Sequence, residues 1–184
     1  MVKPKLPRID IREQEIAKAR EPVEMYGDIV DNVVTELVKD ATLELDECIR
    51  DIMLHLKSPQ EMTVQLLNYY IGYLPTIIYF SGDKAETLGI KSDSSSAIRK
   101  EKYDDMYALA TGKTIPDKQS ETSKLVLNET VVESAYKRAY KKCQTKIEAA
   151  DKVLNSLKKI LQWRISELET TGNTSIGGKF NGRN

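Results

Sequence analysis

The most regular pattern in the chain is a repeat of apolar and small residues near its carboxyl end. Its members are separated only by threes and fours, and ten steps cover 36 residues. The mean step of 3.6 is the period of a straight helix packed against a bundle, whereas a sustained 3.5 favours a left-handed coiled coil. The repeat consists of Val132, Tyr136, Ala139, Cys143, Ile147, Ala150, Leu154, Leu157, Leu161, Ile165 and Leu168. It predicts one long C-terminal helix, about 58 Å long over residues 131–169 alone.

The start of this helix has two alternatives. Thr130 and Glu133 have the spacing of a capping box, in which two side chains satisfy free backbone amides at a helix start. Between Asp117 and Thr171, however, there is no Gly or Pro. The helix therefore begins at Thr130 or continues from near Ser120.

A second apolar stripe occupies the first third of the chain. It consists of Val30, Val34, Leu37, Ala41, Leu45, Cys48, Ile52 and Leu56. This spacing predicts an amphipathic helix that stops at Ser58 and Pro59. Upstream, Asp10 and Glu13 resemble a capping box and predict a short helix that ends before Pro22.

Local signals predict two further helices in the middle of the chain. Ser58, Pro59 and Glu61 combine a cap serine, a proline at the first helical position and a glutamate at the third. Gly72 and Pro75 are expected to kink or break the helix that follows.

The composition from residue 81 to 96 predicts a loop. A fourth helix is expected over 96–110, closed by Gly112, and a connector over 114–120, which contains Pro116.

Residues 62–82 carry no charge in a chain of which 30% is charged. They include five aromatic side chains: Tyr69, Tyr70, Tyr73, Tyr79 and Phe80. Another helix of the fold or the same segment of a second subunit must cover this surface. A membrane span is disfavoured, because polar residues such as Gln65 and Asn68 interrupt the run and no basic cluster flanks it.

Together these patterns predict an all-α fold, a helical bundle that forms a homo-oligomer. We expect a basic N-terminal arm at 1–9, a single helical domain at 10–169 and a flexible tail rich in Gly and Asn at 170–184. The predicted oligomer interface comprises Tyr69, Tyr70, Tyr73, Ile77, Cys143, Ile147, Leu154, Leu157, Leu161 and Ile165.

The net charge of zero hides two segments of opposite sign. Residues 21–61 hold eleven acidic and three basic side chains, a net of −8, and residues 134–166 hold nine basic and two acidic side chains, a net of +7. Either these segments pair with each other, within the bundle or between subunits, or the basic one binds a polyanion.

The inventory of reactive groups favours binding over catalysis. Cys48 and Cys143 fall in apolar stripes and read as reduced core residues of a cytoplasmic protein, and His55 is the single histidine. No metal-ligand spacing, phosphate-binding glycine loop or nucleophile signature occurs in the sequence. We therefore expect no enzyme, no cofactor and no metal site.

Two groups of basic and aromatic residues are candidates for binding single-stranded nucleic acid, in which lysines neutralise phosphates and a ring stacks on a base. One is Arg99, Lys100, Lys102 and Tyr103, although Tyr103 and Tyr107 share a helix face and could both be core. The other is Lys137, Lys141, Lys152, Lys159 and Trp163, opposite the apolar stripe of the last helix. A solvated face or a protein interface is the alternative for this second group.

The order of these features resembles the small helical recombination mediators of tailed phages, of the UvsY type. The likeness covers roughly residues 99–169: a basic and aromatic helix end, then Gly112 and a polar turn, then a long helix with Trp163 and Arg164 near its end. The resemblance implies an all-helical homo-oligomer that binds single-stranded DNA and helps to load a recombinase. It also implies that Arg99, Lys100 and Lys102 contact DNA and that the stripe from Cys143 to Leu168 oligomerises.

The expected function is therefore that of a phage or prophage accessory protein in recombination or replication, located in the host cytoplasm and bound to single-stranded DNA. The alternative is a protein-binding adaptor or structural assembly factor that binds no nucleic acid.

Overall fold

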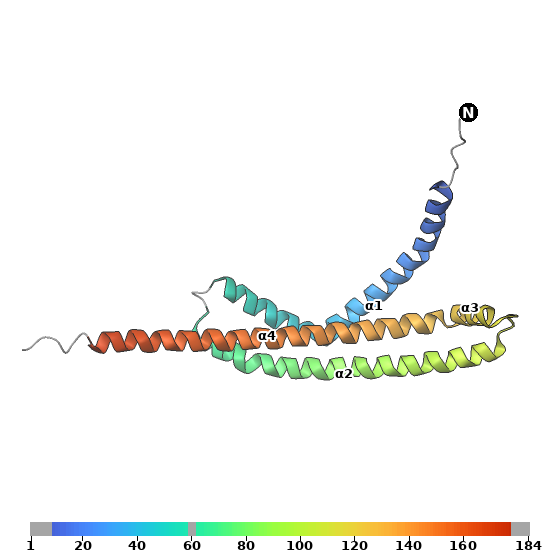
Figure 1. Cartoon of the computed structure of the whole chain (residues 1–184). Coiled ribbons are helices and arrows are strands. Elements are labelled where there is room, and N and C mark those ends of the chain that lie inside the picture. Colours follow the sequence, from blue (N-terminus) through green and yellow to red (C-terminus); the bar gives the residue numbers. More distant parts are fainter. Residues whose placement is uncertain (1–8, 59–61, 178–184) are drawn as a thin grey trace, which may run out of the picture. The chain divides into compact units, whose positions relative to one another are not determined.

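A computed structural model describes residues 9–58 and 62–177, with side chains described over 26–58 and 62–170. These residues form four helices: α1 (Ile9–Lys57), α2 (Val64–Leu109), α3 (Ile115–Leu125) and α4 (Leu127–Gly177) (Figure 1). Within the described ranges there is no strand, so the all-α prediction is confirmed. Residues 1–8 of the predicted arm and 178–184 of the predicted tail lie outside the described residues.

Helix α1 is longer than its local signals predict. It runs without interruption from Ile9 to Lys57, so the separate short helix ending before Pro22 is wrong. A proline removes only one backbone hydrogen bond and crowds one preceding turn. A helix of this length keeps its hydrogen bonds on both sides of such a site.

Helix α2 also passes through its predicted breaks. The kink or break at Gly72 and Pro75 and the loop at 81–96 are wrong as helix ends, because α2 is continuous from Val64 to Leu109. Its buried positions keep steps of three and four from residue 67 to residue 88: Leu67, Tyr70, Leu74, Ile77, Ser81, Ala85 and Leu88. Packing of this face outweighs the weak helix propensity of the exposed Gly72 and Pro75.

The caps differ from those expected. The amide of Leu66 donates to Thr63 Oγ1 over 3.2 Å at the start of α2, whereas residues 59–61 of the predicted start lie outside the described residues. The connector expected at 114–120 is wrong, because Thr114 and Asp117 form a capping box there and open α3. Pro116 is tolerated in the first turn, where its missing amide would have no helical partner.

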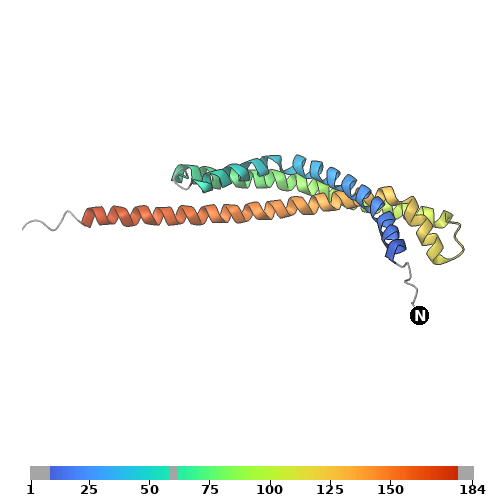
Figure 2. The same cartoon turned by 90° about the horizontal axis from the view of Figure 1, so that it is seen from above.

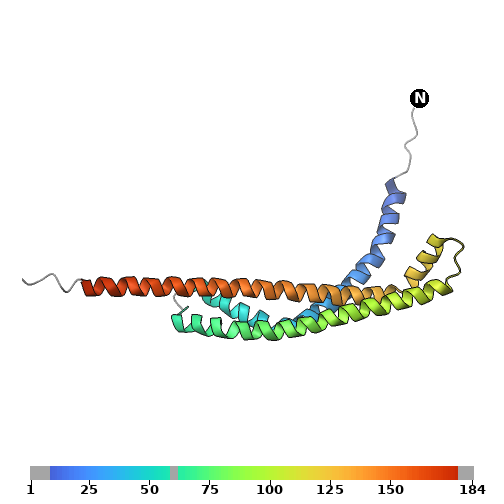
Figure 3. The same ribbon diagram turned by 60° about the horizontal axis from the view of Figure 1, so that its bottom comes forward.

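Helix α4 begins at Leu127, between the two predicted starts, and ends later than predicted. Thr130 is not a cap, since it lies inside α4 and its hydroxyl donates to the Val126 carbonyl over 3.0 Å. The helix ends at Gly177, so the predicted tail boundary at residue 170 does not coincide with the helix end. Val126, with φ −104° and ψ 17°, separates α3 from α4. Figure 3 shows α3 turning away from the start of α4 at this residue.

The chain divides into two compact units. Unit 1 comprises Met1–Leu37 and Leu88–Tyr140, and unit 2 comprises Val38–Thr87 and Lys141–Asn184. The single helical domain expected at 10–169 stays a prediction.

Unit 2 contains the larger cluster of buried apolar side chains, where segments of α1, α2 and α4 run side by side (Figures 1 and 2). Ile52 of α1, Leu67 and Leu74 of α2, and Leu157 of α4 are all fully buried. Each such side chain contributes roughly 1.5 to 3 kcal/mol through its removal from water. The three helices of unit 2 are thus held by one shared apolar seam.

Unit 1 has smaller side chains at its centre. Ala135 and Ala139 of α4 are buried there, as are Val30 and Val34 of α1. At Gly89 of α2, a Cβ would lie 3.2 Å from the ring of Tyr140. Small residues therefore allow close helix contact in this unit.

The space around two glycines, one inside α2 and one beyond its end, predicts opposite effects of substitution. A Cβ at Gly72 would meet no atom within 4 Å, whereas one at Gly112 would lie 2.7 Å from the backbone nitrogen of Lys118. Gly72→Ala should raise the free energy of unfolding by roughly 0.5 to 1 kcal/mol, because Ala restricts the unfolded chain and favours helix. Gly112→Ala should lower the free energy of unfolding, because the added Cβ would clash with this backbone atom.

Denaturant unfolding followed by circular dichroism measures both changes. A loss of stability in Gly72→Ala would contradict a continuous helix through this part of α2.

Candidate functional site

The outer side of α4 in unit 2 presents lysines and the single tryptophan. At 100° per residue, Lys141, Lys152, Lys159 and Trp163 fall within about 40° of arc, opposite the buried Leu157. All four are exposed, and Trp163 retains 63% of its accessible surface. We call these four residues the lysine face. It points to solvent because α1 and α2 occupy the other side of α4.

The lysines of this face carry uncompensated charge. Within the described part of the chain, Lys141, Lys152 and Lys159 make no ion pair. Lys146 differs from them, because its ammonium donates to Asp46 and, over 3.1 Å, to the hydroxyl of the buried Thr42. The pairing of basic and acidic segments that the sequence left open is thus realised at Lys146, to one side of the lysine face.

The second predicted basic group, in unit 1, is arranged differently. Arg99 Nε donates to the carboxylate of Glu133, and Lys102 Nζ donates to that of Glu129. Both bonds join α2 to α4. Two of the three cations expected to contact DNA are therefore engaged inside the chain, while Lys100 and Lys137 are exposed.

We call the two ion pairs Arg99–Glu133 and Lys102–Glu129 the clamp between α2 and α4. The aromatic residues beside this clamp are half-buried. Tyr103 and Tyr107 stack with ring centroids 6.2 Å apart and an interplanar angle of 15°. Glu129 and Glu133 are four residues apart on α4, and Arg99 and Lys102 are three apart on α2, so each pair lies on one side of its own helix. This spacing does not indicate that the two sides meet.

Glu129 is the group on which the clamp acts most strongly. The hydrogen bond from Lys102 holds the pKa of its carboxyl below the usual glutamate value. Its Oε1 accepts that bond, while Oε2 is buried and has no hydrogen-bond partner among the described residues. The hydrogen bond from Lys102 is thus the largest stabilising contact of the charged carboxylate.

A groove between α1 and α2 in unit 2 was not foreseen from the sequence. Its volume is about 270 Å³, and it is lined by Glu44, Glu47 and Asp51 of α1 and by Tyr69 and Tyr73 of α2. Tyr69 stacks on Tyr73 with centroids 5.4 Å apart and an interplanar angle of 23°. We call these five residues the acidic tyrosine groove. Cys48, Tyr70 and Ile77 complete its lining.

His55 holds the buried tyrosine of the groove in place. Its Nδ1 lies 2.9 Å from the Asp51 carbonyl and 3.1 Å from the Tyr70 hydroxyl. Burial, and then the charge of Asp51, raise the pKa of Tyr70 above its ordinary value. The phenol therefore stays neutral, and His55 has a structural role.

The two cysteines are buried and free, and they lie within apolar surroundings. Burial raises the pKa of both thiols above the ordinary cysteine value. Such thiols are poor nucleophiles at neutral pH.

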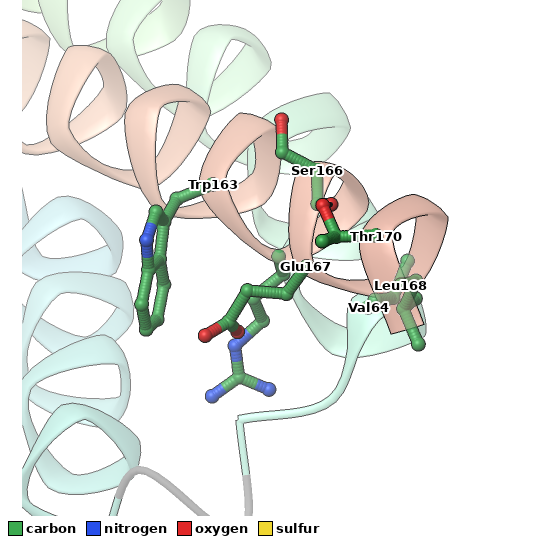
Figure 4. A pocket seen from close by; sticks show the side chains of 7 residues that line it. Val64, Trp163, Ser166, Glu167, Leu168 and Thr170 are labelled. Carbon is green, nitrogen blue, oxygen red and sulfur yellow. Dashed lines mark hydrogen bonds between the residues drawn. The ribbon is translucent and has the colours of Figure 1, made fainter. Parts of the chain in front are cut away.

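A second hollow lies near the end of α4, with a volume of about 820 Å³. Figure 4 shows Trp163 and Glu167 extending to the same side of the helix there, and Val64 of α2 and Leu168 also line the hollow. This hollow adjoins the lysine face through Trp163.

The residues predicted for an oligomer interface occupy three environments. Tyr70, Ile77, Cys143, Leu154 and Leu157 are buried within the chain itself, and Ile147 and Leu161 pack against the core of unit 2. Tyr69, Tyr73 and Ile165 are exposed. These last three offer the most surface to a second copy.

Three further findings concern metal sites, membrane-spanning helices and similarity to known proteins. No group of three or more His, Cys, Asp or Glu side chains in the described ranges could hold a metal ion. None of the helices, as far as they are described, combines the length and apolar character needed to cross a membrane. Comparison with protein-family models, with curated proteins and with solved structures found no match.

The Lys102 clamp predicts a pH-dependent effect of mutation. The folded-state pKa of Glu129 is lowered, so its contribution to stability is present at neutral pH and is lost as the pH falls through that folded pKa. Lys102→Gln should reduce the free energy of unfolding at pH 7. This difference from wild type should shrink as the pH falls through the folded-state pKa of Glu129.

NMR titration of the Glu129 carboxyl, with unfolding measured at each pH, provides the test. Lys100→Gln is the matched control, because Lys100 is exposed on the same helix and makes no ion pair in the described part of the chain. An ordinary glutamate pKa for Glu129 in the wild type would refute the clamp.

Proposed function

We propose that this protein is a non-enzymatic, helical accessory protein that binds single-stranded DNA through the lysine face of α4. The observation that carries the proposal is the combination of three unpaired lysines with a tryptophan that is 63% exposed, all on one side of one helix. Lysines without carboxylate partners are available to neutralise phosphates. An exposed indole beside them can stack on an unpaired base.

The length of the face suits an extended strand. Lys141 and Lys159 are 18 residues apart, which corresponds to about 27 Å along a helix axis. Trp163 follows Lys159 by one helical turn. A strand laid along α4 would thus meet several positive charges and then the ring.

The proposed contacts differ from those implied by the family resemblance. Arg99 and Lys102 are bound to Glu133 and Glu129, so removing them should affect stability more than DNA affinity. The recombination mediators of tailed phages that the chain resembles bind DNA as oligomers and help to load a recombinase. We extend the same role to this protein as part of the proposal.

A protein-binding adaptor is the second candidate, and one observation favours it. The uncharged stretch of α2 leaves large aromatic rings exposed, with Tyr79 at 72% and Phe80 at 55% of their accessible surface. Exposed aromatic side chains are common anchors of protein interfaces. An adaptor with this surface would need no nucleic acid.

Binding to fluorescent oligo-dT at low salt, measured by anisotropy, tests the first proposal. Lys152→Ala with Lys159→Ala should weaken binding and reduce the slope of log K against log salt by about 1.4, or 0.7 for each lost phosphate contact. Trp163→Ala should cost roughly 1 to 3 kcal/mol of binding free energy if the ring stacks on a base.

Two variants serve as controls. Lys39→Ala with Lys57→Ala removes the same charge from exposed sites on α1 of unit 2 and should leave the affinity close to that of wild type. Arg99→Ala with Lys102→Ala should also retain the salt slope. The absence of any anisotropy change with wild-type protein at low salt would reject DNA binding and leave the adaptor.

A further inference from the structure

We propose that the acidic tyrosine groove of one copy of the chain receives the lysine face of α4 from a second copy. The proposal goes beyond DNA binding and does not depend on it. It assigns to the groove an occupant of defined chemistry, a row of lysines on a helix.

The groove carries negative charge that no described residue of the chain neutralises with an ion pair. Within the described residues, Glu44, Glu47 and Asp51 make no ion pair. They are spaced by three and four residues on α1, so their side chains share one side of the helix, and all three line the groove. Three carboxylates held close together attract a cation.

The tyrosines add a second reason for choosing lysine. Tyr69 and Tyr73 are 56% and 43% exposed, and their stacked rings form one wall of the groove. An ammonium group is attracted to the face of an aromatic ring, and the methylene stem of lysine packs on such rings. The groove therefore matches both the head and the stem of a lysine side chain.

The spacing of the carboxylates in the groove also matches the spacing of the lysines on the lysine face. Glu44 and Asp51 are seven residues apart on α1, and Lys152 and Lys159 are seven residues apart on α4. Each separation corresponds to about two helical turns, or 10.5 Å. Two helices lying side by side can thus bring both lysines to both carboxylates at once.

The lysines cannot come from the same copy. Leu157 of α4 is fully buried in the core that the same chain builds with α1 and α2 in unit 2. Lys152 and Lys159 project from the opposite side of α4, away from these helices. A second chain is required to place a lysine face in the groove.

This contact would have a functional consequence. The groove and single-stranded DNA would compete for the same lysines, with carboxylates in the place of phosphates. DNA binding would then expose the groove, and self-association would mask the lysine face.

Charge reversal on each side tests the docking. The groove variant carries Glu44→Lys and Asp51→Lys, and the face variant carries Lys152→Glu and Lys159→Glu. Each alone should self-associate roughly tenfold more weakly than wild type, because like charges then meet in the contact. An equimolar mixture of the two variants should recover association, since the reversed charges are again complementary.

Light scattering at low salt gives the mass of each sample, and circular dichroism confirms that each variant is folded. Asp83→Lys with Glu86→Lys is the control, because it makes the same reversal at exposed sites on α2 outside the groove and should keep the wild-type mass.

Three results would each overturn the docking: a wild-type protein of single-chain mass, a groove variant of wild-type mass, or a mixture that does not recover association. Oligo-dT binding separates this proposal from the proposed function. The groove variant should bind oligo-dT at least as tightly as wild type, and the face variant should not bind it. If no form of the protein binds oligo-dT, the scattering experiment still decides the docking.

Discussion

Burial of one side of α4 is the constraint on which the rest of unit 2 depends. Leu157 and its apolar neighbours on α4 are enclosed by α1 and α2, and this contact fixes the rotation of α4 about its own axis. A helix that turns one side to a core must turn the opposite side to solvent. The exposure of Lys141, Lys152, Lys159 and Trp163 follows from that packing. The same seam brings α1 beside α2 and so creates the acidic tyrosine groove.

The sequence predicts the helical class and the buried stripes well, and the helix ends poorly. Leu154 and Leu157 belong to a stripe whose period alone identifies a helix packed on one side. Gly72 and Pro75 are strong local signals for a break, yet the buried face of α2 continues past them through Leu74 and Ile77. A local signal has an energy of a few kcal/mol at most, and several buried side chains on the same helix exceed it.

The candidate sites also differ in how far the sequence predicts them. The lysine face is a property of a single helix, so residue spacing on α4 was sufficient to find it. The clamps of Arg99 and Lys102 depend on the register of α2 against α4, and the groove depends on the register of α1 against α2. Periodicity along one helix carries no information about register between helices. For that reason two expected DNA contacts proved to be intrachain ion pairs, and the tyrosines foreseen as an interface were not linked to Glu44 or Asp51.

Fluorescence of Trp163 is the most direct test of the central claim, that α4 uses one side for its own core and the other for a ligand. The sequence contains one tryptophan, so the signal needs no assignment. The account predicts that dilute protein emits as a solvent-exposed indole and is readily quenched by acrylamide. It also predicts that oligo-dT at low salt changes the emission and protects the ring, and that added salt reverses both effects. A ring that is already shielded from acrylamide in the dilute protein, or one that does not respond to oligo-dT, would contradict the account.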